Sequence, residues 1–383
     1  MNSVRILVLL LILLLSLVGK AQLLLHGTGS FSYNGYGPLR TQPVKVFYHI
    51  PKGNPKQMPI LMALHGDERD GKAYLDDWVS AADKHGFMVF APEFAENLYG
   101  GGNGYNLANM YADGDQPSAN TARPDSLWTF AVLDPLFNYI KQSTVARATG
   151  YVAFGHSAGA QLLHRFVLYK PNSLLQKAIC ANAGWYTLPN IAIAFPYGAG
   201  ASPFVDSMAK KAFAKNMLVL LGKQDNNANS PGLRHSPEAD AQGTTRLARG
   251  RYFYTKSRAI ANAMPTPYNW TMAEVAGVGH NHTLMAANAL QHVLVAFGPP
   301  TNTPATPIDA FWTDEGISLA GLNAEEVFSI KIYAIEGKLL YASTGIFPAN
   351  QTIAYRPKPT GVYLLQIKTA AHGQLSKRIF CSP

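Results

Sequence analysis

The sequence predicts an α/β protein: a mostly parallel sheet with helices on both faces, followed by a small all-β unit. Up to residue 297, short apolar runs alternate with helical patterns, which is typical of a parallel sheet covered by helices. The stretch 298–307, GPPTNTPATP, is rich in Pro and Thr and is predicted to be an extended linker. Residues 308–383 carry short β-type segments separated by turns, which predicts a β-sandwich-like unit.

Strands are predicted where a short run is rich in aliphatic, β-branched or aromatic residues and is bounded by Gly, Pro or polar residues. Two of these runs, MPILMAL at 58–64 and MLVLL at 217–221, are apolar throughout, as expected for strands that are covered on both faces. The predicted strands of the large unit are 44–50, 58–64, 86–91, 151–155, 178–183, 217–221 and 270–275.

Helices are predicted where apolar residues recur at intervals of three and four. Pro135 lies inside one such pattern, so we expect a kink or a new helix start after Asp134. The predicted helices are 72–85, 127–141, 158–169, 242–263 and 283–297.

The composition excludes several classes of protein. With 48% hydrophobic and 14% charged residues, the chain is not intrinsically disordered. Two cysteines among 383 residues exclude a disulfide scaffold and a Cys-based zinc module, and we expect Cys180 to be a small buried thiol. The His and Asp residues are scattered without metal-ligand spacing, so neither a metal nor a cofactor is predicted.

The net charge of +9 does not come with the basic clusters that nucleic-acid binding requires. The densest group of arginines is Arg246, Arg249 and Arg251. We expect these three side chains to lie along one solvated helix, and nucleic acid is not predicted as a partner.

The amino terminus is predicted to be a secretory signal peptide covering residues 1–21. Arg5 precedes the run 6–18, which is apolar apart from one serine, and this run is shorter than the ~20 residues that span a membrane. Gly19 and Ala21 stand at the −3 and −1 positions of a cut after residue 21. The large unit then spans residues 22–297 of a secreted or cell-surface protein without a transmembrane anchor; the alternative is an uncleaved anchor.

A candidate nucleophile lies in the sequence GHSAG at 155–159, which follows a predicted buried strand and opens a predicted helix. This strand–turn–helix context is that of a nucleophile elbow. Side chains at Gly155 and Gly159 would collide with the neighbouring strand and helix, and the helix N-terminus favours developing negative charge near Ser157. The alternative is a Gly-rich helix start without chemistry.

A serine hydroxyl needs a base, and the base needs an acid that orients it. His280 follows the last predicted strand after Gly-Val-Gly, and its competitor His282 is expected to begin the last helix. Asp225 follows the strand 217–221, and its alternative is Asp240, which lies in a polar stretch. The order Ser157, Asp225, His280 is that of one known class of triad hydrolase.

An oxyanion hole is predicted from two backbone N–H groups, those of Asp67 and Ala158. Asp67 follows His65 and Gly66 at the end of the strand 58–64, and Gly66 lets the backbone approach a carbonyl oxygen closely.

These motifs carry a resemblance. With LHG at 64–66, GHSAGA at 155–160 and GVGH at 277–280, the stretch from about 40 to 297 resembles the α/β-hydrolase superfamily. Within it, the chain looks like secreted esterases of the polyhydroxybutyrate-depolymerase and feruloyl-esterase kind. The resemblance implies a serine esterase that acts on a small or polymeric ester through an acyl-enzyme. The alternatives are a serine peptidase on the same fold and a catalytically silent surface-binding protein.

The last residues resemble the carboxy-terminal sorting domain of the bacterial type IX secretion system. The resemblance rests on SIKIYAIEGKLLY at 329–341, PTGVYLLQI at 359–367 and GQLSKRIF at 373–380. It implies that secretion machinery is a partner and that the protein is exported across the outer membrane. The alternative is a carbohydrate-binding or generic β-sandwich module.

Six further side chains could line a substrate pocket. Aromatic residues in loops at strand ends could surround an acyl or aryl group, although such residues also cover the core, and two polar residues could add contacts. These candidates are Tyr99, Tyr105, Trp185, Tyr186, Asn106 and Arg69.

Overall fold

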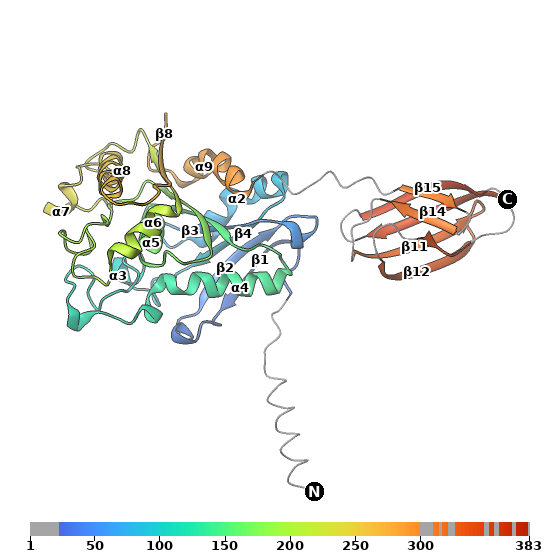
Figure 1. Ribbon diagram of the computed structural model, residues 1–383, viewed down its shortest axis with the longest axis horizontal. Coiled ribbons are helices and arrows are strands. Elements are labelled where there is room, and N and C mark those ends of the chain that lie inside the picture. Colours follow the sequence, from blue (N-terminus) through green and yellow to red (C-terminus); the bar gives the residue numbers. More distant parts are fainter. Residues whose placement is uncertain are drawn as a thin grey trace, which may run out of the picture. The chain divides into compact units, whose positions relative to one another are not determined.

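The computed structural model (Figure 1) describes residues 23–298 and, beyond them, 309–313, 316–320, 326–347, 352–355, 360–369 and 373–381. The chain divides into two compact units, Met1–Phe297 and Gly298–Pro383. The predicted signal peptide at 1–21 and all of the predicted linker 298–307 except Gly298 lie outside the described residues. Each unit is described by itself.

The first unit is built on an eight-stranded sheet with the strand order β1-β2-β4-β3-β5-β6-β7-β8. β1 and β2 pair antiparallel, β2 pairs antiparallel with β4, and all the other neighbours pair parallel. The strands are β1 Gly27–Tyr33, β2 Val44–Ile50, β3 Ile60–Leu64, β4 Met88–Glu93, β5 Tyr151–His156, β6 Leu175–Ala181, β7 Asn216–Gly222 and β8 Trp270–Val275. The predicted mostly parallel sheet is confirmed.

Helices cover both faces of this sheet (Figure 1). On one face, α2 Gly71–His85 and α9 His282–Phe297 bury side chains such as Trp78 and Met285 against the strands. On the other face lie α4 Leu133–Thr144, α5 Ala158–Tyr169, α6 Asp206–Ala214 and α8 Arg246–Asn262, whose buried residues include Phe137, Phe166 and Phe253. Two short helices, α3 Gly101–Gly104 and α7 Pro237–Asp240, lie in loops.

Some boundaries differ from the prediction for local reasons. Helix α4 begins at Leu133 rather than at 127, because residues 125–132 form two 3₁₀ turns. Pro135 therefore lies in the first turn of α4, where its missing N–H needs no partner, and it neither kinks nor restarts the helix. Helix α8 begins at Arg246 rather than at 242, because the Thr245 side chain caps it by accepting a hydrogen bond from the Ala248 amide.

Besides the short helices and 3₁₀ turns in the loops, β1 and α6 of the first unit were not predicted. β1, with the sequence GTGSFSY, contains few apolar residues, and it is an edge strand that pairs only with β2. Helix α6 has the sequence DSMAKKAFA, in which only Ala209, Ala212 and Phe213 are buried. Short, weakly apolar elements like these give little periodic signal.

The second unit is all-β, as predicted, and its strands pair antiparallel. β11 Glu326–Ala334, β12 Leu339–Phe347, β14 Gly361–Thr369 and β15 Gly373–Cys381 form a four-stranded sheet in the order β12-β11-β14-β15. β9 Asp309–Thr313, β10 Gly316–Ala320 and β13 Thr352–Ile353 form a second, three-stranded sheet. Among the described residues, the buried side chains of this unit form a separate hydrophobic cluster that includes Ile317, Ile332 and Leu365.

Candidate active site

Ser157 occupies a sharp turn between β5 and α5. Its backbone has φ 55° and ψ −117°, a left-handed conformation that is unfavourable for a residue with a side chain. Two glycines make room for the turn. A Cβ atom at Gly155 would lie 2.5 Å from the Gly159 carbonyl oxygen, and one at Gly159 would collide with the Leu64 and His65 carbonyls at the end of β3. The tight crossing of β5, α5 and β3 thus leaves space only for glycine at these positions.

His280 lies between Ser157 and Asp225. Its Nε2 is 3.0 Å from Ser157 Oγ, and its Nδ1 is 2.7 Å from Asp225 Oδ2. Because a carboxylate only accepts, Nδ1 carries the ring hydrogen and Nε2 is left to accept the serine proton. The loops that hold the two residues are joined, since the Gln224 amide donates to the Val278 carbonyl. The structure thus brings together three residues that were predicted from separate strand ends.

The two competing residues have other partners. His282 begins α9, as predicted; its Nδ1 bonds Asp77 Oδ2 at 2.6 Å and its ring stacks on Tyr74. The hydrogen bond to Asp77 raises the pKa of His282 against the opposing effect of burial. Asp240 ends α7, where its Oδ1 bonds His235 and Arg249 instead of His280.

The loop after β3 lies against the serine. An added Cβ at Gly66 would be 3.7 Å from the Ser157 Cβ, so the chain passes close to Ser157 just before Asp67. Among the described residues, the Asp67 amide donates to no backbone carbonyl. Ala158 is the first residue of α5, so its amide has no partner within the helix. Asp67 and Ala158 line the same pocket as Ser157, and within the described part of the chain neither amide donates to a backbone carbonyl.

A buried histidine supports this loop. The His65 Nε2 accepts from the Phe94 amide at 2.9 Å, so Nδ1 carries the hydrogen and donates to the Gly66 carbonyl at 2.8 Å. Burial lowers the pKa of His65 to about 4, although the hydrogen bond to the Gly66 carbonyl acts to raise it. The Tyr105 hydroxyl donates to the His65 carbonyl, and the two rings stack on each other. His65 is therefore a neutral ring that fixes the backbone ahead of Asp67.

His156 lies beside Ser157 in the chain, and its ring contacts that of His280. Its ring centroid is 4.6 Å from that of His280, and the Tyr74 hydroxyl is 3.0 Å from its Nδ1. Burial, and then the neighbouring rings of His280 and His282, lower the pKa of His156 well below its ordinary value. His156 is therefore neutral and packs against His280, and its ring nitrogen Nδ1 is bonded to Tyr74 rather than to Ser157.

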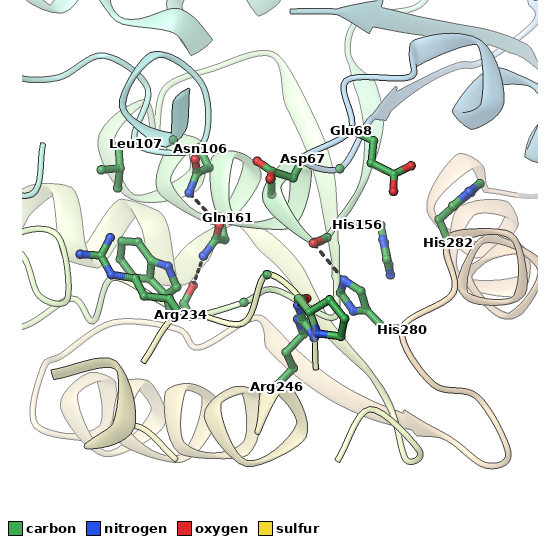
Figure 2. Close-up of a pocket in the computed structure, with 18 of the residues that line it drawn as sticks. Asp67, Glu68, Asn106, Leu107, His156, Gln161, Arg234, Arg246, His280 and His282 are labelled. Carbon is green, nitrogen blue, oxygen red and sulfur yellow. Dashed lines mark hydrogen bonds between the residues drawn. The ribbon is translucent and has the colours of Figure 1, made fainter. Parts of the chain in front are cut away.

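An open pocket of about 740 Å³ surrounds Ser157 and His280. Figure 2 shows that its lining differs from side to side: Asp67 and Glu68 lie toward His282, whereas Asn106, Leu107 and Arg234 lie on the opposite side. One part of the wall is thus acidic, and the other combines amide and apolar groups with an arginine that is paired with Asp115.

Of the six predicted pocket side chains, two line this pocket, namely Trp185 and Asn106. The prediction is wrong for the other four among the described lining residues, because each is taken up by a structural contact. Tyr99 bonds the Gln42 carbonyl, Tyr105 bonds the His65 carbonyl, Tyr186 stacks on Phe253, and Arg69 bonds the Phe94 and Gly101 carbonyls.

The lining also includes residues that were not predicted as site residues, among them Gln161, Arg234 and Arg246. Gln161 accepts from Asn106 and donates to the Trp185 carbonyl, so it fixes the Trp185 side of the pocket. The guanidinium of Arg234 lies over the Trp185 ring and pairs with Asp115. Nothing in their sequence surroundings marks these side chains as pocket residues.

The expectation of a solvated arginine helix is wrong for two of its three members. Arg246 and Arg249 are buried, whereas Arg251 is exposed and pairs with Glu274. The spacing of three between Arg246 and Arg249 places them on one helix face, and that face of α8 turns out to be the inner one.

Among the described residues, no group of His, Cys, Asp or Glu side chains is arranged to hold a metal ion. In the same part of the chain, no helix has the length and apolar character needed to cross a membrane. Cys180 in β6 is a free and buried thiol, as predicted.

Solved structures resemble this chain, although no protein-family model and no curated protein matches it. Poly(aspartic acid) hydrolase-1 from Sphingomonas sp. KT-1 is 33% identical, with a TM-score of 0.67 over 70% of this chain and 99% of its own. The poly(3-hydroxybutyrate) depolymerase LpqC from Bordetella parapertussis is 28% identical, with a TM-score of 0.66 over 73% of this chain and 92% of its own.

Proposed function

The chain belongs to the α/β-hydrolase family that includes these two polymer hydrolases, and on that premise we propose that it is a secreted serine esterase. The reaction class, hydrolysis, is common to both relatives. The ester as substrate, the roles of the residues and the secretion of the protein are our proposal.

In the proposed mechanism, the Ser157 oxygen attacks the ester carbonyl while His280 Nε2 takes the hydroxyl proton. Asp225 holds His280 in the required tautomer and stabilises the imidazolium that forms. The N–H groups of Asp67 and Ala158 donate to the oxygen of the tetrahedral intermediate. His280 then gives its proton to the departing alkoxide, which leaves an acyl group on Ser157.

Water completes the cycle. His280 takes a proton from the water as it attacks the acyl carbonyl, and then returns that proton to Ser157 Oγ as the acid is released. No cofactor takes part in any of these steps. The observation that carries the proposal is the position of His280, with one ring nitrogen 3.0 Å from Ser157 Oγ and the other 2.7 Å from the buried Asp225.

The experiment is hydrolysis of short-chain p-nitrophenyl esters by the purified protein, with the Ser157→Ala variant as control. Saturable turnover that depends on Ser157 is expected. If the protein hydrolyses no ester and its Ser157 does not react with a fluorophosphonate, the fold serves a silent binding protein and the proposal fails.

A second candidate is hydrolysis of an amide polymer. The same triad can cleave amides, the relative with 33% identity is a poly(aspartic acid) hydrolase, and Arg234 in the pocket could pair with a carboxylate of such a chain. Asp67 and Glu68 in the same pocket oppose a polyanion. Parallel assays with poly(3-hydroxybutyrate), poly(aspartic acid) and a peptide p-nitroanilide separate ester from amide chemistry.

The predicted signal peptide and the resemblance of residues 308–383 to a type IX sorting domain support export as part of the proposal. Export would deliver the enzyme to polymeric or small esters outside the cell. The secretion machinery would then be the partner of the carboxy-terminal unit.

A further inference from the structure

Asp225 has a second charged neighbour besides His280. Arg246, the first residue of α8, places its Nη1 3.5 Å from Asp225 Oδ1, and the side chains are only 5% and 1% exposed. The two oxygens of the carboxylate therefore face different groups: Oδ2 faces the His280 ring and Oδ1 faces the guanidinium. Figure 2 shows Arg246 and His280 on the same side of the pocket.

The guanidinium of Arg246 makes few hydrogen bonds for a buried charge. Nη2 donates to the Pro231 carbonyl at 3.3 Å. Nε and Nη1 have no hydrogen-bond partner among the described residues, and neither atom is accessible to solvent. A substrate group in the pocket therefore cannot reach these two nitrogens. The charge of Arg246 acts on what is already buried beside it, which is Asp225.

Burying a cation that makes so few hydrogen bonds raises the free energy of the folded protein unless a nearby anion compensates its charge. Burial lowers the pKa of Arg246, and the negative charge of Asp225 acts in the opposite direction. The other buried arginine on the same helix face differs: Arg249 donates to the Gly184, Gly243 and Arg234 carbonyls and pairs with Asp240. Hydrogen bonds to three carbonyls and the ion pair with Asp240 account for the burial of Arg249. For Arg246, the compensating group is the carboxylate of Asp225.

We propose that Arg246 is a positioning residue that extends the triad: it offsets the charge of Asp225 in the resting enzyme, so that His280 stays unprotonated and free to act as base. Without a cation at Oδ1, the buried carboxylate would be neutralised by a proton held on His280. A protonated His280 cannot take the proton of Ser157. The inference rests on the proposed function, because it assigns His280 the role of base.

Other charged groups face the same rings but do not offset Asp225. His156 lies against His280 and is neutral. His282 at the start of α9 is paired with Asp77 of α2. Asp67 and Glu68 line the pocket from the loop after β3 and would favour a protonated His280. Among these described groups, Arg246 is the cation in contact with the buried carboxylate.

The test measures how fast Ser157 reacts with a fluorophosphonate between pH 5 and 9, followed by intact-protein mass spectrometry. In this reaction Ser157 Oγ bonds to phosphorus, fluoride leaves and His280 takes the proton, so the rate reports the base without requiring the natural substrate. Arg246→Met should move the acid limb of this profile to higher pH. The loss of rate should be at least about tenfold greater at pH 6 than at pH 9.

Three further variants separate charge from structure. Arg246→Lys keeps the charge and should keep the acid limb near its wild-type position, whereas Arg246→Gln should behave like Arg246→Met. Arg249→Met removes a buried arginine one turn along α8, so it should lower stability without moving the acid limb. If Arg246→Met does not fold, the comparison of the Lys and Gln variants carries the test.

Two outcomes overturn the inference about Arg246 while the proposed function stands. In one, Ser157 reacts in a His280-dependent way but the uncharged Arg246 variants lose rate by the same factor at every pH, as a structural defect would cause. In the other, the acid limb of the pH profile moves as far in Arg246→Lys as in Arg246→Met. If His280→Ala leaves the labelling rate unchanged, the proposed function itself fails.

Discussion

Ser157 combines a strained backbone with an unhindered hydroxyl. A left-handed conformation costs of order 1–3 kcal/mol at a non-glycine residue and persists because β5, α5 and the end of β3 surround it closely. The same conformation directs the hydroxyl toward His280 rather than into the helix.

We predict that Ser157→Ala lowers ester turnover by roughly 10⁴–10⁶, because residues of a triad act as a unit. Substrate binding should change little, since the hydroxyl is small and the pocket walls remain. The measurement is kcat and KM on a p-nitrophenyl ester, with KM taken as an indication of binding. Retention of more than about a tenth of wild-type turnover would contradict the role of Ser157.

The two neighbouring histidines should respond differently to substitution. His280→Ala should abolish turnover to a similar degree, because its Nε2 is the nitrogen within reach of Ser157 Oγ. His282→Ala should keep most of the activity, because His282 is bonded to Asp77 and stacked on Tyr74. The comparison is of kcat/KM for the two purified variants, and the reverse result would exchange their roles.

At the scale of elements, the site depends on how closely β3, β5 and α5 approach each other. The carbonyls of Leu64 and His65 occupy the place where a side chain at Gly159 would be. The same β3 end continues into Gly66 and Asp67, so the packing of this crossing also sets the position of the predicted oxyanion donor.

We therefore predict that Gly159→Ala lowers the free energy of unfolding by about 1–3 kcal/mol, the usual cost of overpacking. The activity should fall as well, because the β3 end must move away from Ser157. Urea denaturation and kcat/KM measure the two effects. The control is Gly37→Ala, where an added Cβ meets no atom within 4 Å; an equal loss in both variants would show that the crossing is not the cause.

At the scale of the whole molecule, buried neutral histidines couple stability to pH. The pKa of His65 is lowered to about 4 in the folded chain, against about 6.5 for an unfolded histidine. Between these values the unfolded chain binds more protons, so stability is complete above pH 6.5 and declines as the pH falls toward 4. The pKa values of His156 and His164 are lowered as well, so these residues also make the folded chain less stable as the pH falls.

We predict that the free energy of unfolding falls between pH 7.5 and 4.5, with His65 contributing up to about 3 kcal/mol. The measurement is urea denaturation at a series of pH values. Carboxylates also titrate in this range, so the decisive comparison is with His65→Gln, which should show a shallower decline. A decline of equal slope in both proteins would mean that His65 is not the neutral buried ring described above.

Among the described residues, the first unit has two hydrophobic clusters, which end before residue 298, and the second unit has one, which begins at Ala310. The first unit, which ends at Phe297, is large enough to bury the surface needed to fold without the second unit. We therefore predict that a chain ending near Thr303 folds and keeps nearly unchanged kcat/KM on a small soluble ester.

The same truncation tests the proposed export. In the native host it should leave the protein in the periplasm, as shown by fractionation and immunoblotting. Normal release into the medium would contradict the type IX interpretation. Loss of activity on an insoluble polymer alone would instead identify the second unit as a substrate-binding module.

The sequence by itself determined the alternation of strands and helices and the strand ends that carry Ser157, Asp225 and His280. These features are local. The periodicity of a strand or helix can be recognised within a short stretch of sequence. A parallel sheet brings the carboxyl ends of its strands to one edge, whatever the sequence of the loops.

Only the tertiary structure decided which polar side chains face the pocket and which are buried. Arg246 and Arg251 stand five residues apart on one helix, yet one contacts the buried Asp225 and the other is exposed. Tyr105 and Arg69 support the β3 loop from within, although their sequence surroundings suggest pocket residues equally well. The side that a helix or loop turns inward depends on contacts with residues far away in the sequence, and no local pattern records those contacts.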